Sequence, residues 1–208
     1  MKKVNQGKED LIPQEEWVKE SEIQGTDEMV LKHPIMNKAF EEILKKHIPR
    51  KKIALVSLCS STRPYSKSRK WKKFKEEFEN DCDLIIASNG GIIPITFEEC
   101  YPYLTYDAHG QKQYDQMYIE YLYRRLMKFF TVFNYEYIIF NFRPKLRNRI
   151  SAKLFIRDYK GSSKVFILPN AETYDKARKN KFKPYGGRYP DISSDVLDEI
   201  RETIEKIK

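Results

Sequence analysis

The chain has 208 residues, 39 Lys and Arg against 30 Asp and Glu, and a formal net charge of +9, which suits one domain with a sizeable core. Hydrophobic residues make up 40% and charged residues 33% of the chain, a balance that excludes intrinsic disorder. It has no apolar run of the roughly 20 residues that span a bilayer and no apolar leader after Met1, so we expect a cytoplasmic protein without membrane segments.

The N-terminal part of the chain is acidic. Ten of its first fifty residues are Asp or Glu, and we expect the residues before about Asp27 to be loosely attached. We therefore assign residues 1–30 to an N-terminal acidic extension and residues 31–208 to a single α/β domain. Pro34 suits the first turn of a helix. The apolar face of that helix comprises Met36, Phe40, Ile43, Leu44 and His47.

Four short apolar runs rich in β-branched residues predict strands that are buried on both faces. They cover residues 53–58, 84–87, 137–140 and 165–168. Helices are expected between and after the strands, over about residues 68–80, over 114–133 and at the C-terminal end. Strands that alternate with helices indicate right-handed crossovers. The sequence therefore predicts a three-layer α/β/α sandwich with a short, mainly parallel four-stranded sheet.

Positive charge is concentrated in three stretches that are almost free of acids. They cover residues 63–75, 143–164 and 176–188. If they converge in the fold, they form a field that attracts a polyanion such as nucleic acid. The 14 tyrosines favour RNA, because aromatic faces stack on unpaired bases. The alternatives are a solvated Lys-rich surface and tyrosines that belong to the core.

The turn after the first strand carries the most distinctive chemistry, since ligands of parallel α/β sheets bind at the carboxyl ends of the strands. There Cys59 is followed by hydroxyl residues, an arginine and a helix start. Cations and a helix N-terminus lower the pKa of a thiol, which makes Cys59 the first candidate nucleophile. The alternative is a small buried residue at a strand end. Cys82 and Cys100 are interpreted as buried residues, and the spacing of the three cysteines suits neither disulfides nor a zinc site.

Two further segments follow strands and face the expected cleft. Asn89, Gly90 and Gly91 bring backbone close to a ligand or form a plain turn. Arg143 follows the third strand and is a candidate for substrate binding.

The turn at Cys59 resembles the Pro-Cys-Ser-x-x-Lys-Pro-Tyr-Ser-x-Ser-x-Ser-His signature of archaeosine synthase, an archaeal tRNA-modifying enzyme related to the tRNA-guanine transglycosylases. The positions that match are Cys59, Ser60, Pro64, Tyr65, Ser66 and Ser68. The similarity extends over about residues 31–140 and includes Tyr106-Asp107 and Gly110. This resemblance implies a fold like that of uracil-DNA glycosylase.

The reaction that the resemblance implies is the addition of lysine to the nitrile of a cyano-deazaguanine base in tRNA. A thiolate attacks a nitrile to give a thioimide, so Cys59 is the candidate covalent residue. Asp107 is the candidate for holding the ammonium or accepting a proton, and His109 is the nearby histidine. The candidates for binding the substrate are Ser60, Arg63, Tyr65, Ser66, Ser68, Asn89, Gly90, Gly91, Tyr106 and Arg143.

The partners expected from this resemblance are tRNA, a subunit with a PUA domain or a transglycosylase-like fold, and a radical-SAM enzyme. No metal or other cofactor is expected in this chain. The sequence departs from the signature at Leu58, at Arg63, which replaces a lysine, and at Lys70-Trp71, which replaces Ser-His. Because of these departures, a non-catalytic nucleic-acid-binding module remains an alternative, and a base-excision glycosylase ranks last.

Overall fold

The computed structural model describes residues 10–109, 116–144, 146–179 and 190–208. Its centre is a five-stranded sheet in the order β4-β3-β2-β6-β7, in which only β4 is antiparallel to its neighbour. The bounds are β2 Ile53–Leu58, β3 Cys82–Ser88, β4 Gly91–Pro94, β6 Tyr137–Asn141 and β7 Lys164–Leu168. The sheet is mixed and mostly parallel, and all four predicted strands belong to it.

The strand of this sheet that the sequence did not predict is β4. It pairs with β3 through a tight turn in which Ser88 lies opposite Gly91, and Gly91 has a φ of 109°, a value that L side chains rarely adopt. Pro94 is tolerated because β4 lies at the edge of the sheet, where a missing N–H breaks no ladder. The segment Ser88-Asn89-Gly90-Gly91 therefore ends one strand and immediately starts another.

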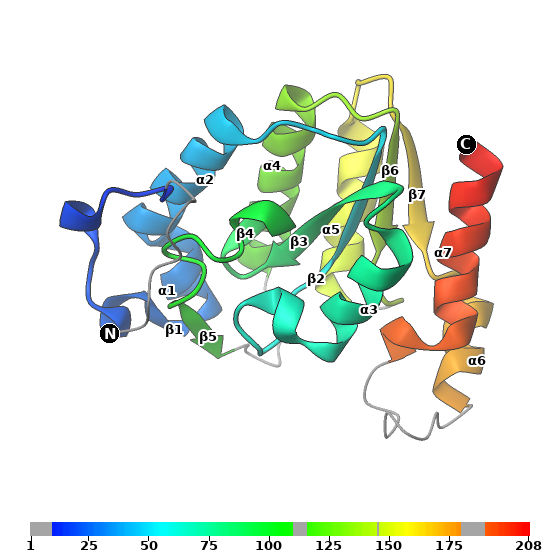
Figure 1. The fold of residues 1–208 in the computed structure, drawn as a ribbon, viewed down its shortest axis with the longest axis horizontal. Coiled ribbons are helices and arrows are strands. Elements are labelled where there is room, and N and C mark those ends of the chain that lie inside the picture. The colour runs from blue at the N-terminus through cyan, green and yellow to red at the C-terminus, as the bar shows by residue number, and fades with distance from the viewer. Residues whose placement is uncertain (1–9, 110–115, 145, 180–189) are drawn as a thin grey trace.

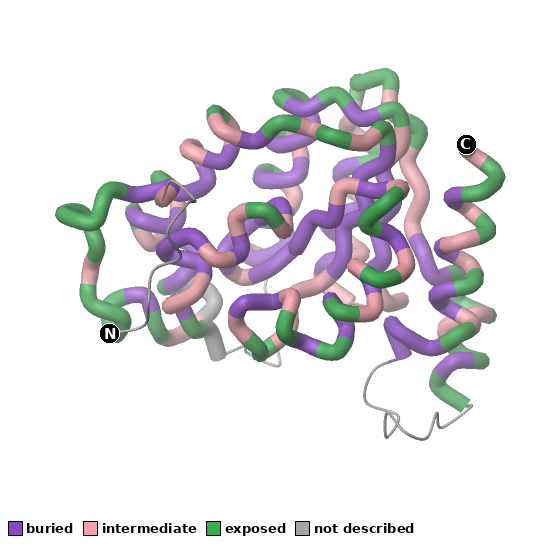
Figure 2. The backbone as a smooth tube through the Cα atoms, viewed as in Figure 1, coloured by how far each residue is buried: buried purple, intermediate pink, exposed green. Residues whose placement is uncertain are grey.

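Strand β7 forms the opposite edge, and its predicted burial on both faces is wrong. Val165, Phe166 and Ile167 are only half-buried, whereas Ala54, Leu55 and Val56 of β2 are inaccessible. Figure 2 shows this gradient as the change from a buried centre to an intermediate edge. An apolar run thus predicted the strand correctly but not its place in the sheet, because run length carries no information on strand order.

Helices cover both faces of the sheet (Figure 1), with α3 and α7 on one side and α4 and α5 on the other. The predicted helices are confirmed as α2 Pro34–Lys46, α3 Arg69–Phe78, α4 Gln116–Val132 and α7 Ser194–Ile207. The sequence did not predict α1 Asp27–Lys32, α5 Arg147–Asp158 and α6 Ala171–Lys179. The reason is weak patterning, because α6 buries only Ala177 and α5 buries two polar residues, Asn148 and Ser151. No helix among the described residues is long and apolar enough to cross a membrane.

The described part of the acidic segment packs on the domain. Leu11, Ile12 and Ile23 are buried in the core, and the Trp17 ring stacks on Tyr101 with centroids 4.6 Å apart. The expected loose attachment before Asp27 is therefore wrong for residues 10–26. A second, two-stranded parallel sheet joins β1 Gln24–Thr26 to β5 Asp107–His109. Short 3-10 helices lie at Gln14–Glu16, Glu20–Ile23, Tyr65–Lys67, Ile95–Phe97 and Pro190–Ile192.

Candidate functional site

Three parallel strands end at one edge of the sheet and bring the candidate residues together. Cys59 directly follows β2, is half-buried, and its amide donates to the Ala87 carbonyl at 3.0 Å. Ser88 ends the neighbouring strand on one side and Asn141 ends the strand on the other. The thiol therefore stands at the carboxyl edge of the sheet, between β3 and β6, which is the usual ligand-binding edge of such folds.

Arg63 is held between two aromatic rings beside this edge. Its guanidinium carbon lies 4.2 Å from the ring centroid of Tyr65 and 4.7 Å from that of Tyr106, which is a cation–π arrangement. The two phenol hydroxyls hydrogen-bond to each other, and the Tyr106 hydroxyl donates to Ser88 Oγ at 2.8 Å. The network thus ties the turn after β2 to the end of β3.

Both phenols are buried, with Tyr65 inaccessible and Tyr106 3% exposed. Burial is the main reason that the pKa of each phenol is raised, so both are neutral hydroxyls at physiological pH. Burial lowers the pKa of Arg63, but the phenols and Cys59 together raise it above its ordinary value. The rings therefore support the charge of Arg63 from inside the protein and do not present an open face for stacking.

The turn after β3 packs directly on this network. The Gly90 amide donates to Ser88 Oγ at 2.9 Å, and a Cβ at Gly90 would lie 2.8 Å from Cε of Met36 and 3.1 Å from Cζ of Tyr106. A side chain at this position would therefore press on the Tyr106 ring, which favours glycine there. Asn89 and Gly90 are the two turn residues between β3 and β4, and this hairpin turn supports the site.

The predicted serine residues have structural partners. Ser60 Oγ donates to the Thr62 carbonyl at 3.3 Å, and the Ser66 amide donates to the Glu98 carboxylate at 2.7 Å. Glu98 is buried, and burial raises the pKa of its carboxyl group. Ser68 is the N-cap of α3, and its Oγ accepts from the Trp71 amide at 3.3 Å.

Replacing Ser68 with Ala is expected to lower the free energy of unfolding by about 1 kcal/mol, because the Trp71 amide loses its capping acceptor. Urea unfolding of the two proteins measures this change. Ser68→Asp keeps a capping oxygen and is expected to restore most of the loss. An unchanged midpoint in Ser68→Ala would contradict the role of Ser68 as the cap.

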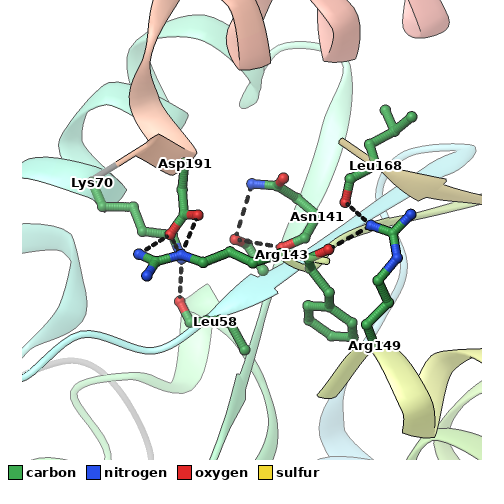
Figure 3. Close-up of polar contacts among 9 residues, drawn as sticks. Leu58, Lys70, Asn141, Arg143, Arg149, Leu168 and Asp191 are labelled. Carbon is green, nitrogen blue, oxygen red and sulfur yellow. Dashed lines mark hydrogen bonds and ion pairs between the residues drawn. The ribbon is translucent and has the colours of Figure 1, made fainter. Parts of the chain in front are cut away.

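The structure places a cluster of charges behind the Cys59 turn (Figure 3) that the sequence did not predict. Asp191 accepts from Nε and Nη2 of Arg143 at 2.6 and 2.8 Å, and its carboxylate lies 3.8 Å from Lys70 Nζ. Lys70 Nζ donates to the Leu58 carbonyl at 2.8 Å. Arg143, a predicted substrate-binding residue, therefore directs two of its donors to Asp191 within the chain.

Burial changes the protonation of this cluster. It lowers the pKa of Lys70 to about 8, an effect that Asp191 and Cys59 oppose and Arg143 reinforces. Burial also raises the pKa of Asp191, but Lys70 and Arg143 hold it below its ordinary value. Lys70 precedes Phe74 by four residues, so a charged residue at the spacing of the apolar helix face was the signal in the sequence.

Two further polar side chains lie at the same edge. Arg149 Nη1 donates to the carbonyls of Phe142 at 2.7 Å and Pro169 at 2.8 Å, which joins the ends of β6 and β7. Asn141 is 2% exposed, and its Nδ2 donates to Ser57 Oγ at 3.3 Å. Its Oδ1 atom is buried without a hydrogen-bond partner in the described structure, which leaves an acceptor for a donor group of a ligand.

Asp107 and His109 lie in β5, in the two-stranded sheet. Asp107 is exposed and pairs in register with Gln24, and the backbone of His109 pairs with Thr26. The side chain of His109 and all of Gly110 lie outside the described residues. Asp107 therefore belongs to a different sheet from the strands that end at Cys59, although its neighbour Tyr106 belongs to the network around Cys59.

The described ranges contain no group of three or more His, Cys, Asp or Glu side chains that could hold a metal ion. The chemistry available at the end of β2 is that of the Cys59 thiol, the Arg63 guanidinium and Lys70, an amine with a lowered pKa.

A family model described as a domain of unknown function (DUF5591) matches residues 36–166, more than half of the chain. The chain belongs to the DUF5591 family. The matched region begins within α2 and ends within β7, so it includes Cys59, Arg63, Lys70 and Arg143. Asp191, which pairs with Lys70 and Arg143, lies C-terminal to the DUF5591 match.

The crystal structure of AF0587, an archaeal protein of unknown function, is similar to this DUF5591 chain with a TM-score of 0.58 and 14% sequence identity. The similarity covers 80% of this chain and 49% of AF0587. The chain therefore spans about half the length of AF0587, and the likeness concerns the fold alone. No curated protein matches the sequence.

Proposed function

We propose that this DUF5591 chain is the catalytic core or a subunit of an archaeosine-synthase-like enzyme that adds lysine to the nitrile of a cyano-deazaguanine base in tRNA. The observation that carries the proposal is the position of Cys59, at the carboxyl end of β2 and beside Arg63 and Lys70. The signature that resembles archaeosine synthase surrounds the same thiol, and a glycosylase-like sandwich agrees with a mostly parallel sheet flanked by helices.

The proposed chemistry has two balanced steps. The Cys59 thiolate attacks the nitrile carbon, a C–S bond forms, and the nitrile nitrogen takes a proton to give a thioimide. The amine of lysine then attacks the same carbon, the C–S bond breaks, and the thiolate leaves while the amine loses a proton. Arg63 stabilises negative charge beside the reacting carbon. Asn141 Oδ1 supplies an acceptor for an N–H group of the base.

Exposed cations near this edge support tRNA as the substrate. Lys67 and Arg69 follow the Cys59 turn, and Arg178 and Lys179 end α6, the helix that begins just beyond β7. Contacts from such cations to phosphates give affinity without sequence selection and make binding depend steeply on salt. Recognition of the modified base is then the task of the residues around Cys59.

The test is mass spectrometry of nucleosides from tRNA that carries cyano-deazaguanine, after incubation with lysine and the protein. We expect a base that gains the mass of lysine, and we expect Cys59→Ala to reduce its formation by at least about a hundredfold. The matched control is Cys82→Ala, because Cys82 is buried at the start of β3, at the other end of the sheet.

Two outcomes contradict parts of the proposal. An adduct that forms undiminished in Cys59→Ala removes the covalent step. A folded protein that binds tRNA in a salt-dependent way but forms no adduct indicates a nucleic-acid-binding module instead, in which Cys59 and Asp107 are replaceable without loss of binding.

A further inference from the structure

The cluster behind the Cys59 turn holds more positive than negative charge. Lys70 and Asp191 each have side chains 5% exposed, and the Arg143 side chain is 28% exposed. The Asp191 carboxylate therefore faces two cations. Both of its oxygens already accept hydrogen bonds from Arg143 in a bidentate pair. A buried cation with only part of a counter-ion is costly, so an additional negative group nearby is stabilising.

Cys59 is the acidic group placed to supply that charge. Lys70 Nζ donates to the carbonyl of Leu58, the residue that directly precedes Cys59, at 2.8 Å. The lysine reaches this carbonyl from α3, so it joins the helix to the end of β2. Cys59 in turn is one of the groups that act electrostatically on Lys70, which places the thiol within range of the ammonium.

We propose that Lys70 is a positioning residue for Cys59. Lys70 fixes the peptide that carries the thiol, and it supplies the buried positive charge that keeps Cys59 a thiolate at neutral pH. The consequence for lysine addition rests on the proposed function, but the state of the thiol does not. The proposal also accounts for a lysine at a position where the archaeosine-synthase signature has a serine.

Other charged or titratable groups face the same two residues. Arg63, Tyr65 and Tyr106 surround Cys59 from the turn after β2 and from the segment before β5. The phenols are neutral at physiological pH, so Arg63 is the second cation that favours the thiolate. Two charged groups face Lys70. Asp191 comes from the C-terminal part of the chain, and Arg143 comes from the segment after β6. Removing Lys70 therefore lowers the fraction of Cys59 that is thiolate at neutral pH without reducing it to zero.

The experiment measures the rate of alkylation of the full chain by iodoacetamide between pH 5 and pH 10, with mass spectrometry to locate the label. Cys82 and Cys100 are each 3% exposed, so Cys59 is the expected site in the native protein. We expect Lys70→Met to raise the midpoint of the rate profile by about one pH unit and to slow alkylation at pH 7 about two- to fivefold, which is the loss that such a shift causes in a thiol that is largely thiolate at neutral pH.

Three variants separate charge from structure. Lys70→Arg keeps the charge and is expected to retain most of the reactivity, whereas Lys70→Gln keeps a donor for the Leu58 carbonyl and is expected to behave like Lys70→Met. Lys72→Met removes an exposed lysine of the same helix and is expected to leave the profile unchanged. Lys70→Met leaves Asp191 paired with Arg143, so the variant is expected to fold.

A profile of Lys70→Met or Lys70→Gln that coincides with the wild type, in a protein that unfolds cooperatively, overturns the proposal. An equal shift in Lys72→Met also overturns it, because the effect is then one of net charge. Alkylation needs neither tRNA nor lysine. If Lys70→Met shifts the alkylation midpoint as expected but the wild type forms no lysine adduct on tRNA, the result contradicts the proposed function and leaves the role of Lys70 intact.

Discussion

Replacing Asp191 with Ala is expected to lower the free energy of unfolding by about 3–5 kcal/mol, because it removes the carboxylate that pairs with the buried Lys70 and with Arg143. Lys70 cannot move to solvent without breaking its bond to Leu58, and its side chain is only 5% exposed. The most direct relief is deprotonation of Lys70, which itself costs free energy at pH 7. Urea unfolding at pH 7 measures the loss.

The double variant Lys70→Met/Asp191→Ala provides the control for this prediction. It removes one of the two cations that Asp191 compensates, so it is expected to be more stable than Asp191→Ala alone, with a coupling of at least about 1 kcal/mol. The exposed pair Lys38–Glu16 is a matched comparison, and Glu16→Ala is expected to change stability by less than about 1 kcal/mol. If Lys70→Met and Asp191→Ala had strictly additive effects on the free energy of unfolding, the result would contradict an ionic interaction between the two residues.

Acid is expected to destabilise the protein through His47, by about 2.5 kcal/mol between pH 7 and pH 4.5. His47 is 8% exposed, its Nε2 lies 2.9 Å from the Tyr135 hydroxyl, and its ring packs against Phe129 and Phe133. Burial lowers the pKa of His47 to about 4, although Asp83 opposes the shift. The unfolded chain binds a proton below about pH 6.5, so stability is lost as the pH falls from about 6.5 to about 4.

Urea unfolding of the wild type and of His47→Gln at both pH values isolates this effect. Glutamine can keep a hydrogen bond to Tyr135 but does not titrate, so the variant is expected to be less stable at pH 7 and to lose about 2.5 kcal/mol less on acidification. Carboxylates titrate alike in both proteins. Equal losses in the two proteins would show that His47 is not the group that takes up the proton.

The sequence alone predicted the strands that lie inside the sheet, because a parallel strand covered on both faces must be apolar throughout. Residues 53–58 and 137–140 are of this kind, and the structure places them at the centre of the sheet. Strand β4 was missed because four residues between a glycine turn and a proline carry too little pattern. The helices α5 and α6 were missed because few of their residues are buried and some of those are polar.

The sequence by itself also determined the place of the candidate site, since a cysteine that directly follows a buried strand must stand at the carboxyl edge of a parallel sheet. Only the tertiary structure decided what surrounds that cysteine. The sandwich of Arg63 between Tyr65 and Tyr106, and the pairing of Arg143 and Lys70 with Asp191, join residues from separate elements. Such pairs depend on how helices and loops converge on the sheet, and local patterns of charge and hydrophobicity do not encode that convergence.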